Sequence, residues 1–597
     1  MYRSPNWGID GAAPASVKPD DSVQLMWGVK IPMRDGVNLN ATIMRRKDAP
    51  PLPVIFLLTP YLADSYHIRA AYFSRNGYVF ASVDCRGRGN SAGEFIPNFS
   101  EGRDGYDLVE WFAAQPWCDG QVTMWGGSYG GFDQWMTLRE QPPHLKTIVP
   151  VASAHMGVDF PMNNNIAYPY VLRWMTYTSG VTPNANLFAD NVFWTAKYRE
   201  LYRTHAAFKT FDQIVGNLST QWQTWVAHPL IDDFWQPLDI TPAEYDRIDM
   251  PILSITGHYD GDQPGAFAYY KRHMASQSPS RAEHYLIVGP WDHAGTRTPN
   301  RHIGGLDFGE ASMVDMHQLH KDWYDWTLKG GAKPEFLKQR VAYYVLGSNE
   351  WKYADSLETL ASETRQLYLD SHGTASDVFA SGMLKPELPS ASASDSYIYD
   401  PLDTRPGDAE KEDGDENYLV DQTADLNLFG GGLVYHTAPF TEPTEISGFV
   451  KLTAWVQIDV PDTDFVVRVA EVLPDGRYIL LTSDMKRARY RESLRAEKLV
   501  TPGELICYEF DSFMFFSRLV QAGSRLRLTF ASPNSYQLQK NYNSGGIVAD
   551  ETGADARTAH ITLYHDADHP SYLELPIVAT TSAPAAARPA EAIKPEM

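Results

Sequence analysis

The sequence predicts an α/β protein that has a largely parallel sheet, a helical insertion and a C-terminal β-sandwich. Three observations indicate this architecture. Continuous apolar runs alternate with amphipathic stretches up to about residue 150, an aromatic-rich helical region follows, and alternating strand patterns begin after about residue 355. The 597 residues suffice for three to four domains of roughly 100 to 200 residues each.

The first strands are predicted from the apolar runs 54–58, 78–83, 122–125 and 147–151. Continuous runs, as opposed to alternating ones, are typical of parallel strands that are covered on both faces. Amphipathic patterns over 106–114 and 132–138 predict helices between these strands. The repetition of strand, helix and strand predicts right-handed α/β winding.

A helical cap is predicted where the sheet pattern stops, over residues 154–245. Strand-like runs resume at 252–255 and 285–288, so the excursion is most simply an insertion between two strands of one sheet. The region is dense in tryptophan: Trp174, Trp194, Trp222, Trp225 and Trp235. Any one of these is more often a core residue than a substrate wall, and Trp174 is the candidate for a substrate contact.

The C-terminal half is predicted to be an antiparallel jelly-roll sandwich, because runs such as 448–456, 465–469 and 525–530 alternate in polarity. The polar stretch 404–417 predicts an exposed loop. The expected domains are 1–153 and 246–355 for the two parts of the α/β domain, 154–245 for the cap, 356–580 for the jelly roll and 581–597 for a disordered tail.

Composition limits the classes of partner. Lys and Arg total 51 against 74 Asp and Glu, a net charge of −23 that repels nucleic acid and anionic membrane surfaces. The three cysteines are too few for a disulfide framework and fit a reducing compartment. Neither a secretory signal nor an apolar run of about 20 residues is evident, so the expected location is the cytoplasm.

The motif Gly126-Gly127-Ser128-Tyr129-Gly130 lies between the predicted strand 122–125 and the helical pattern 132–138. A nucleophilic serine of an α/β-hydrolase fold sits on a cramped turn of this kind, where glycine permits close backbone approach. The turn places Ser128 at a helix N-terminus, where the Tyr129 amide can donate to an oxyanion. The alternative is a glycine-rich turn whose serine only caps the helix.

A nucleophilic serine needs a base and a carboxylate that orients the base. In α/β-hydrolases these follow in the order Ser, Asp or Glu, then His, each after a later strand. Run 252–255 leads into Asp260 and run 285–288 into His293, so these are the predicted carboxylate and base. The nearest alternatives are Asp262, Asp292 and His258.

Further motifs extend this pattern: Asp84-x-Arg86-Gly87-x-Gly89-x-Ser91-x-Gly93, Gln115-Pro116-Trp117, His258-Tyr259-Asp260-Gly261 and Gly289-Pro290-Trp291-x-His293. With the serine motif they make nearly the whole chain resemble the group of cocaine esterases, α-amino-acid ester hydrolases and X-prolyl dipeptidyl peptidases. The resemblance implies an α/β-hydrolase domain, a helical cap and a jelly roll. It implies a triad of Ser128, Asp260 and His293, and an oxyanion hole of the Tyr129 amide and the Tyr61 hydroxyl.

The resemblance also bears on substrate. Amino-acid ester hydrolases of this group hold the substrate ammonium with clustered acids, two of them shortly after the triad aspartate. Here only Asp262 stands in that place, followed by Gln263, and Asp159 of the cap is a further candidate contact. The X-prolyl peptidases of the group are usually longer than this chain, because they carry an additional N-terminal domain. The resemblance therefore favours esters over peptides as substrates.

The sequence thus predicts a serine hydrolase that needs no cofactor or metal ion and cleaves small-molecule carboxylic esters, or amides, through an acyl-enzyme. Cap aromatics favour a bulky or aromatic acyl group. The alternatives are an X-prolyl dipeptidyl peptidase, an α-amino-acid ester hydrolase or acylase, and a non-catalytic carbohydrate-binding protein suggested by the jelly roll alone. The oligomeric state stays open, with a homo-oligomer as one option.

Overall fold

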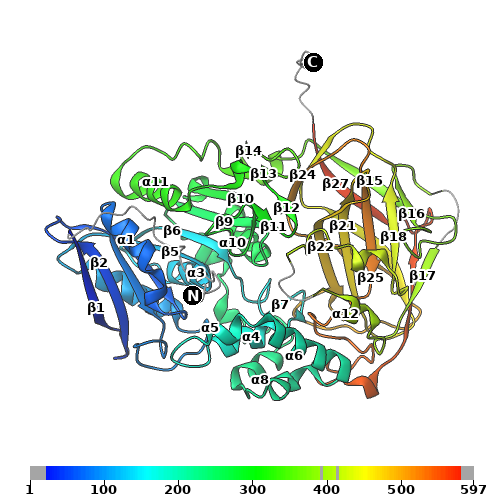
Figure 1. Cartoon of the computed structure of the whole chain (residues 1–597), viewed down its shortest axis with the longest axis horizontal. Helices are drawn as coiled ribbons and strands as arrows, with labels where there is room; N and C mark the ends of the chain where they lie inside the picture. The colour runs from blue at the N-terminus through cyan, green and yellow to red at the C-terminus, as the bar shows by residue number, and fades with distance from the viewer. Residues whose placement is uncertain (1–21, 390–393, 412–415, 580–597) are drawn as a thin grey trace, which may run out of the picture.

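The computed structural model describes residues 22–389, 394–411 and 416–579. The expected tail, 581–597, lies outside these residues. The α/β domain and the β-rich C-terminal domain lie side by side, and the cap helices run beneath both in the view of Figure 1. No helix in the described ranges has the length and apolar character that a bilayer crossing requires.

A ten-stranded sheet forms the α/β domain. In spatial order its strands are β1 (Val23–Pro32), β2 (Asn38–Arg46), β4 (Val79–Asp84), β3 (Leu52–Thr59), β5 (Cys118–Ser128), β6 (Leu145–Ser153), β9 (Ile252–Tyr259), β10 (His284–Asp292), β13 (Val341–Val345) and β14 (Glu350–Ala354). The seven strands from β4 to β13 are mutually parallel, and β1, β2 and β14 are antiparallel additions at the edges. The predicted α/β class is confirmed.

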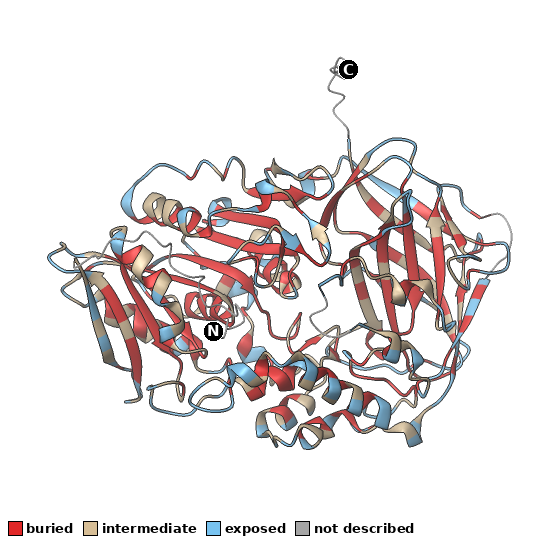
Figure 2. Ribbon diagram, viewed as in Figure 1, coloured by how far each residue is buried: buried red, intermediate tan, exposed pale blue. Residues whose placement is uncertain are grey.

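Helices cover both faces of this sheet, which explains its continuous apolar runs. On one face Val54 and Phe56 pack in a cluster with α2 (Glu101–Ala113) and α3 (Tyr129–Arg139). On the other face Ile55 and Leu57 pack with α1 (His67–Arg75) and α11 (Met316–Lys329). α10 (Gln263–Ala275) follows β9. The strands are accordingly red throughout their centres in Figure 2.

Strands β5, β9 and β10 extend several residues beyond their predicted apolar runs. The extra residues include glycine, histidine and aspartate, which an apolar pattern does not mark. They lie at the carboxyl edge of the parallel sheet, where ligands bind in open α/β folds.

The cap region contains the short strands β7 (Met162–Asn163) and β8 (Ile166–Ala167) and six helices: α4 (Tyr170–Tyr177), α5 (Ala185–Phe188), α6 (Asn191–Thr204), α7 (Phe211–Val215), α8 (Thr220–Val226) and α9 (Pro242–Tyr245). All five cap tryptophans are buried and share one hydrophobic cluster with α2 and α3. The cap is thus packed onto the α/β domain through a common core.

In its described residues the C-terminal domain has 13 strands: β15 (Glu363–Asp370), β16 (Gly382–Lys385), β17 (Ser394–Tyr399), β18 (Gly432–Thr437), β19 (Thr444–Gly448), β20 (Lys451–Ile458), β21 (Asp464–Val472), β22 (Tyr478–Arg487), β23 (Leu505–Phe510), β24 (Phe516–Val520), β25 (Arg525–Ala531), β26 (Ala559–Tyr564) and β27 (Tyr572–Val578). Every pairing is antiparallel except β16 with β18. Hydrogen bonds link all 13 into one sheet, because β20 pairs with β23, β26 and β27. Its inner side chains form a separate core.

The predicted exposed loop 404–417 is confirmed only in part within its described residues: Arg405 and Asp408 are exposed, but Gly407 is buried. The segment contains α12 (Arg405–Ala409), and a Cβ on Gly407 would lie 2.6 Å from the ring of the cap residue Tyr202. Glu410 accepts a hydrogen bond of 2.8 Å from Ser535. The polar side chains find partners across the contact between cap and C-terminal domain, which composition does not reveal.

Candidate active site

Ser128 is the last residue of β5, and α3 begins at the next residue. Its backbone angles, φ 61° and ψ −120°, are strained for a residue with a side chain. The predicted need for glycine is confirmed by the packing: a Cβ on Gly126 would lie 2.9 Å from the Gly130 carbonyl oxygen. A Cβ on Gly131 would lie 2.9 Å from the Val151 oxygen. The turn therefore has the geometry of a nucleophile elbow.

Asp260 and His293 meet at the carboxyl edge of the sheet, one residue after β9 and one after β10 respectively. His293 Nδ1 lies 2.8 Å from Asp260 Oδ1. Asp260 is fully buried, and it also accepts hydrogen bonds from the hydroxyl of Thr256 (2.9 Å) and the amide of Asp262 (3.0 Å). These bonds fix the carboxylate that orients the imidazole.

Two of the three alternative residues are engaged elsewhere. His258 is buried, and its Nδ1 accepts a long hydrogen bond of 3.4 Å from the amide of Ser517. Asp292 accepts a bond of 2.7 Å from the Gly295 amide. The third, Asp262, lies close to His293, with 3.7 Å between its Oδ2 and His293 Nδ1.

Electrostatics favour the charged forms of both paired groups. Burial alone would raise the pKa of Asp260, but the charge of His293 and its hydrogen bond outweigh burial and hold that pKa below its usual range. Burial and Arg297 act to lower the pKa of His293, whereas Asp262 and the bond to Asp260 raise it, and the net direction is upward.

Ser128 and His293 line two cavities in common. Cavity A, about 140 Å³, is also lined by Tyr66, Arg69, Trp125 and Arg297. Cavity B, about 290 Å³, is also lined by Tyr129, Met156, Phe160 and Asp262. Within the described residues no hydrogen bond joins Ser128 to His293, and such contacts are often long before substrate binds.

Tyr61 lies two residues after β3 and borders both cavities. Its phenolic oxygen accepts a hydrogen bond of 2.9 Å from Trp174 Nε1. Burial raises the pKa of Tyr61 well above its usual value, so the phenol keeps its proton. Because the indole N–H can only donate, that proton is left for another acceptor.

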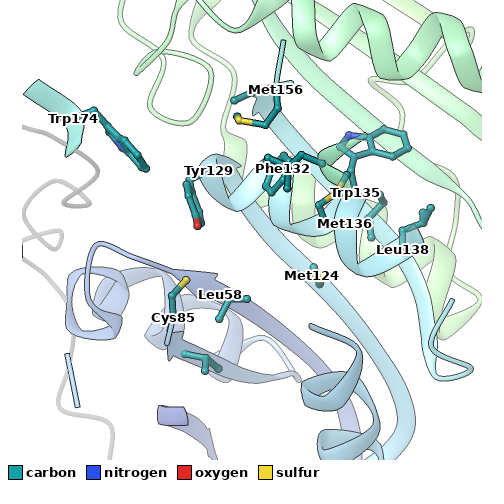
Figure 3. Close-up of a cluster of buried hydrophobic side chains, with 14 of the residues drawn as sticks. Leu58, Cys85, Met124, Tyr129, Phe132, Trp135, Met136, Leu138, Met156 and Trp174 are labelled. Carbon is teal, nitrogen blue, oxygen red and sulfur yellow. The ribbon is translucent and has the colours of Figure 1, made fainter. Parts of the chain in front are cut away.

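Tyr129 carries the backbone amide that follows the serine. Its ring stacks on Trp174 with centroids 5.8 Å apart, and Figure 3 shows the two side by side at the start of α3. Its hydroxyl donates to Glu101 and accepts from the Asn98 amide at 2.8 Å. Burial raises the pKa of Glu101 to about 7. The sequence analysis missed Glu101, which only the packing of α2 against α3 brings to this ring.

The two expected acidic contacts differ in position. Asp262 lines cavity B, and burial raises its pKa to about 8 while His293 acts in the opposite direction. Asp159 is not among the described residues that line either cavity. Its oxygens accept the amides of His155 (2.8 Å) and Gly265 (2.6 Å). The structure thus places Asp159 outside the lining of both cavities, where its bond to Gly265 links the cap to α10.

Trp174 borders both cavities, as expected of a substrate contact, and also belongs to the main hydrophobic cluster. Among the described residues no group of three or more His, Cys, Asp and Glu side chains is placed to hold a metal ion.

A serine on a nucleophile elbow, beside a buried aspartate and histidine at the carboxyl edge of a parallel sheet, defines an α/β-hydrolase-type serine hydrolase. Residues 35–295 match the family model of X-Pro dipeptidyl-peptidase (S15 family). Residues 335–574 match the model of the X-Pro dipeptidyl-peptidase C-terminal non-catalytic domain. The chain is thus similar to X-Pro dipeptidyl-peptidases of the S15 family in both its α/β domain and its C-terminal domain.

One relative and two solved structures are similar to this chain over nearly its whole length. The chain is 28% identical to the cocaine esterase of Rhodococcus sp. (strain MB1 Bresler) over 589 residues, 94% of this chain and 99% of that protein. An α-amino acid ester hydrolase structure superposes with a TM-score of 0.81 at 22% identity, over 96% of this chain and 99% of the other. The structure of an aminopeptidase from a Thaumarchaeota archaeon superposes with a TM-score of 0.78 at 23% identity, over 96% of this chain and 99% of the other. These two structures confirm the fold.

Proposed function

We propose that the protein hydrolyses carboxylic esters of small molecules through an acyl-enzyme on Ser128. The observation that carries the proposal is the 2.8 Å bond between His293 and the buried Asp260, in a pair that shares two cavities with Ser128. Asp260 leaves Nδ1 protonated and Nε2 free to accept the serine proton. An esterase among the full-length relatives supports the ester class.

The reaction follows from these positions. His293 accepts the proton of Ser128 as the serine oxygen attacks the ester carbonyl, and the new oxyanion is held by the Tyr61 hydroxyl and the Tyr129 amide. His293 then gives the proton to the departing alcohol. Water activated by His293 hydrolyses the acyl-enzyme in the same way and frees Ser128.

The aromatic walls of the two cavities favour a bulky or aromatic acyl group. Cavity B borders Phe160, Tyr170 and Trp174, which offer flat apolar surface beside the serine. We expect benzoyl or phenylacetyl esters to be cleaved at least as well as short aliphatic ones. A large advantage of acetyl esters would contradict this part of the proposal.

A serine-directed fluorophosphonate tests the catalytic role. Intact-mass analysis should show one adduct on the wild type and none on Ser128→Ala, and the variant should lose about 10⁴- to 10⁶-fold in kcat, the scale for a triad nucleophile. Circular dichroism checks that the variant is folded. An unlabelled wild type, or a variant with wild-type turnover, would end the proposal.

A second candidate function is hydrolysis of esters or amides that carry a free α-amino group. The observation that favours it is Asp262, a carboxyl group in cavity B that faces the same space as Ser128 and His293. A cation would stabilise its charged form. Strong preference for an α-amino ester over its N-acetyl analogue, lost in Asp262→Asn, would select this candidate over a simple esterase.

A further inference from the structure

Cavity A holds two guanidinium groups beside the proposed nucleophile. Arg69 of α1 and Arg297, four residues after His293, both line it together with Ser128. No aspartate or glutamate is among the described residues that line this cavity. Cavity B differs in charge because its lining includes Asp262 and no arginine among the described residues.

Arg297 lies directly against the nucleophile elbow. A Cβ on Gly127 would come within 2.5 Å of its Nη1, so the guanidinium covers the residue that precedes Ser128. Nη1 is buried, and it has no hydrogen-bond partner within the described part of the chain. A buried charged donor without an acceptor is costly, and an acceptor supplied by a ligand would remove that cost.

Arg69 adds a second positive charge to the same cavity. Its side chain is buried, and its Cζ lies 3.8 Å from the centre of the Trp125 ring. Such stacking fixes the plane of a guanidinium. Two guanidinium groups that line one partly enclosed space favour an anionic ligand there.

We propose that cavity A binds a carboxylate of the substrate, so that the enzyme prefers esters which carry a free carboxylate in addition to the bond that is cleaved. The planar fork of arginine matches a carboxylate with two parallel hydrogen bonds. A carboxylate also carries a single charge, which a protein of net charge −23 repels less than a phosphate dianion. This inference rests on the proposed esterase function.

Matched ester pairs test the inference and show which part of the substrate carries the carboxylate. For the acyl part, 4-nitrophenyl hydrogen glutarate is compared with its methyl ester. For the alcohol part, 3-carboxyphenyl butyrate is compared with 3-(methoxycarbonyl)phenyl butyrate. In one pair the carboxylate ester should have the higher kcat/KM by about 10-fold or more, the scale of one charge-assisted hydrogen bond.

Variants assign that preference to the cavity. Arg297→Gln should lower the ratio of kcat/KM between the two members of the pair by about 10- to 100-fold. Arg297→Lys should retain part of the ratio, because it keeps the charge but loses the fork. Arg301→Gln is the matched control, since Arg301 pairs with Asp307 (2.6 Å) outside the cavity lining, and its ratio should equal that of the wild type.

The possible results separate this inference from the proposed function. If Ser128-dependent cleavage of the uncharged esters occurs without carboxylate preference in either pair, only the inference is overturned. A preference that survives Arg297→Gln also overturns it. If neither pair is cleaved and the fluorophosphonate does not label Ser128, the proposed function itself has failed. Should Arg297→Gln not fold, the wild-type ratio and Arg297→Lys still decide the matter.

Discussion

Trp174 donates a hydrogen bond of 2.9 Å from its indole Nε1 to the phenolic oxygen of Tyr61. Trp174 belongs to the cap, whereas Tyr61 follows strand β3 of the α/β domain. The bond therefore links the cap to a proposed oxyanion donor. Because the indole occupies a lone pair of the phenol, it restricts the directions in which the Tyr61 proton can point.

This relationship predicts unequal and coupled effects of two substitutions. Tyr61→Phe should lower kcat by about 10²- to 10³-fold, the scale for one oxyanion donor. Trp174→Phe keeps an aromatic ring but frees the phenol to turn, so we expect a loss of about 2- to 10-fold, the scale of one neutral hydrogen bond. In the double variant Trp174→Phe should cause no further loss of kcat beyond that of Tyr61→Phe. Steady-state kinetics on one ester measure all three variants.

A neighbouring tryptophan provides the control. Trp225 also stacks on Trp174, with centroids 6.4 Å apart, and its Nε1 has no hydrogen-bond partner in the described ranges. Trp225→Phe should leave kcat near the wild-type value. If Trp174→Phe and Trp225→Phe lose the same activity, or if the losses at Tyr61 and Trp174 multiply fully, the positioning role of Trp174 is wrong.

The pH profile depends on Asp262. His293 must be neutral to act as a base, so kcat/KM should rise through an apparent pKa above the usual 6.5 of histidine. Asp262 raises the pKa of His293 by its negative charge, and a protonated His293 in turn favours the ionised form of Asp262, so the two groups titrate as a pair. Removing that charge in Asp262→Asn should move the acidic limb of the profile to lower pH, whereas Arg297→Gln, which removes a positive charge, should move it to higher pH.

Opposite shifts in these two variants are the sign of an electrostatic effect. They are measured as kcat/KM for an uncharged ester over the pH range in which the enzyme is stable. An acidic limb that stays at the same pH in both variants would show that neither charge affects the pKa of His293. Shifts in the same direction would point to a general disturbance of the site.

The candidate site was predictable from sequence to the extent that it depends on strand ends. Ser128, Asp260 and His293 each follow an apolar run, and parallel strands bring such positions to one edge. The oxyanion role of Tyr61 was implied only by the family resemblance. Other features depend on contacts between distant segments. Glu101 meets Tyr129 only because α2 packs on α3, and no local pattern marks that pairing.

The position of Asp159 shows a related limit of sequence analysis. A carboxyl group in the cap can face the cavity or bind backbone amides outside it, and the sequence alone does not distinguish these two orientations. The structure shows two backbone amides as its partners. The described part of segment 404–417 shows the same limit, since Asp408 accepts from Arg203 of the cap and Glu410 accepts from Ser535.

Glu101 predicts a pH-dependent stability. Burial raises its pKa to about 7 from an ordinary 4.5, so the folded state favours the protonated form. This contribution is fully present below pH 4.5 and is lost as pH rises through 7. At about 1.4 kcal/mol for each pKa unit, Glu101→Gln should therefore gain up to about 3 kcal/mol over the wild type at pH 8 and nothing at pH 4.5.

Urea unfolding at both pH values measures this difference in the free energy of unfolding. The side-chain amide that Glu101→Gln introduces can still accept from the Tyr129 hydroxyl, so the comparison keeps the hydrogen bond. Glu94→Gln is the control, because Glu94 is exposed on the loop before α2. An equal change in the two variants, or a Glu101→Gln difference that does not grow with pH, would contradict the burial argument.

Gly131 predicts a packing defect that reaches the active site. It lies in the first turn of α3, and a Cβ there would stand 2.9 Å from both the Val151 oxygen and the Ser153 Cα of β6. Gly131→Ala should force α3 away from the sheet and lower the free energy of unfolding by about 1 to 3 kcal/mol, the usual cost of overpacking. Because α3 carries the Tyr129 amide, kcat should fall as well.

A glycine with open surroundings separates this effect from a general intolerance of alanine. No heavy atom lies within 4 Å of a Cβ on Gly431 in the C-terminal domain, so Gly431→Ala should keep wild-type stability and kcat. Thermal unfolding and turnover of one ester are measured for both variants. If Gly131→Ala is as stable and active as Gly431→Ala, the close contact between α3 and β6 does not set the position of the elbow. A small movement of the helix would then admit the methyl group without displacing the Tyr129 amide.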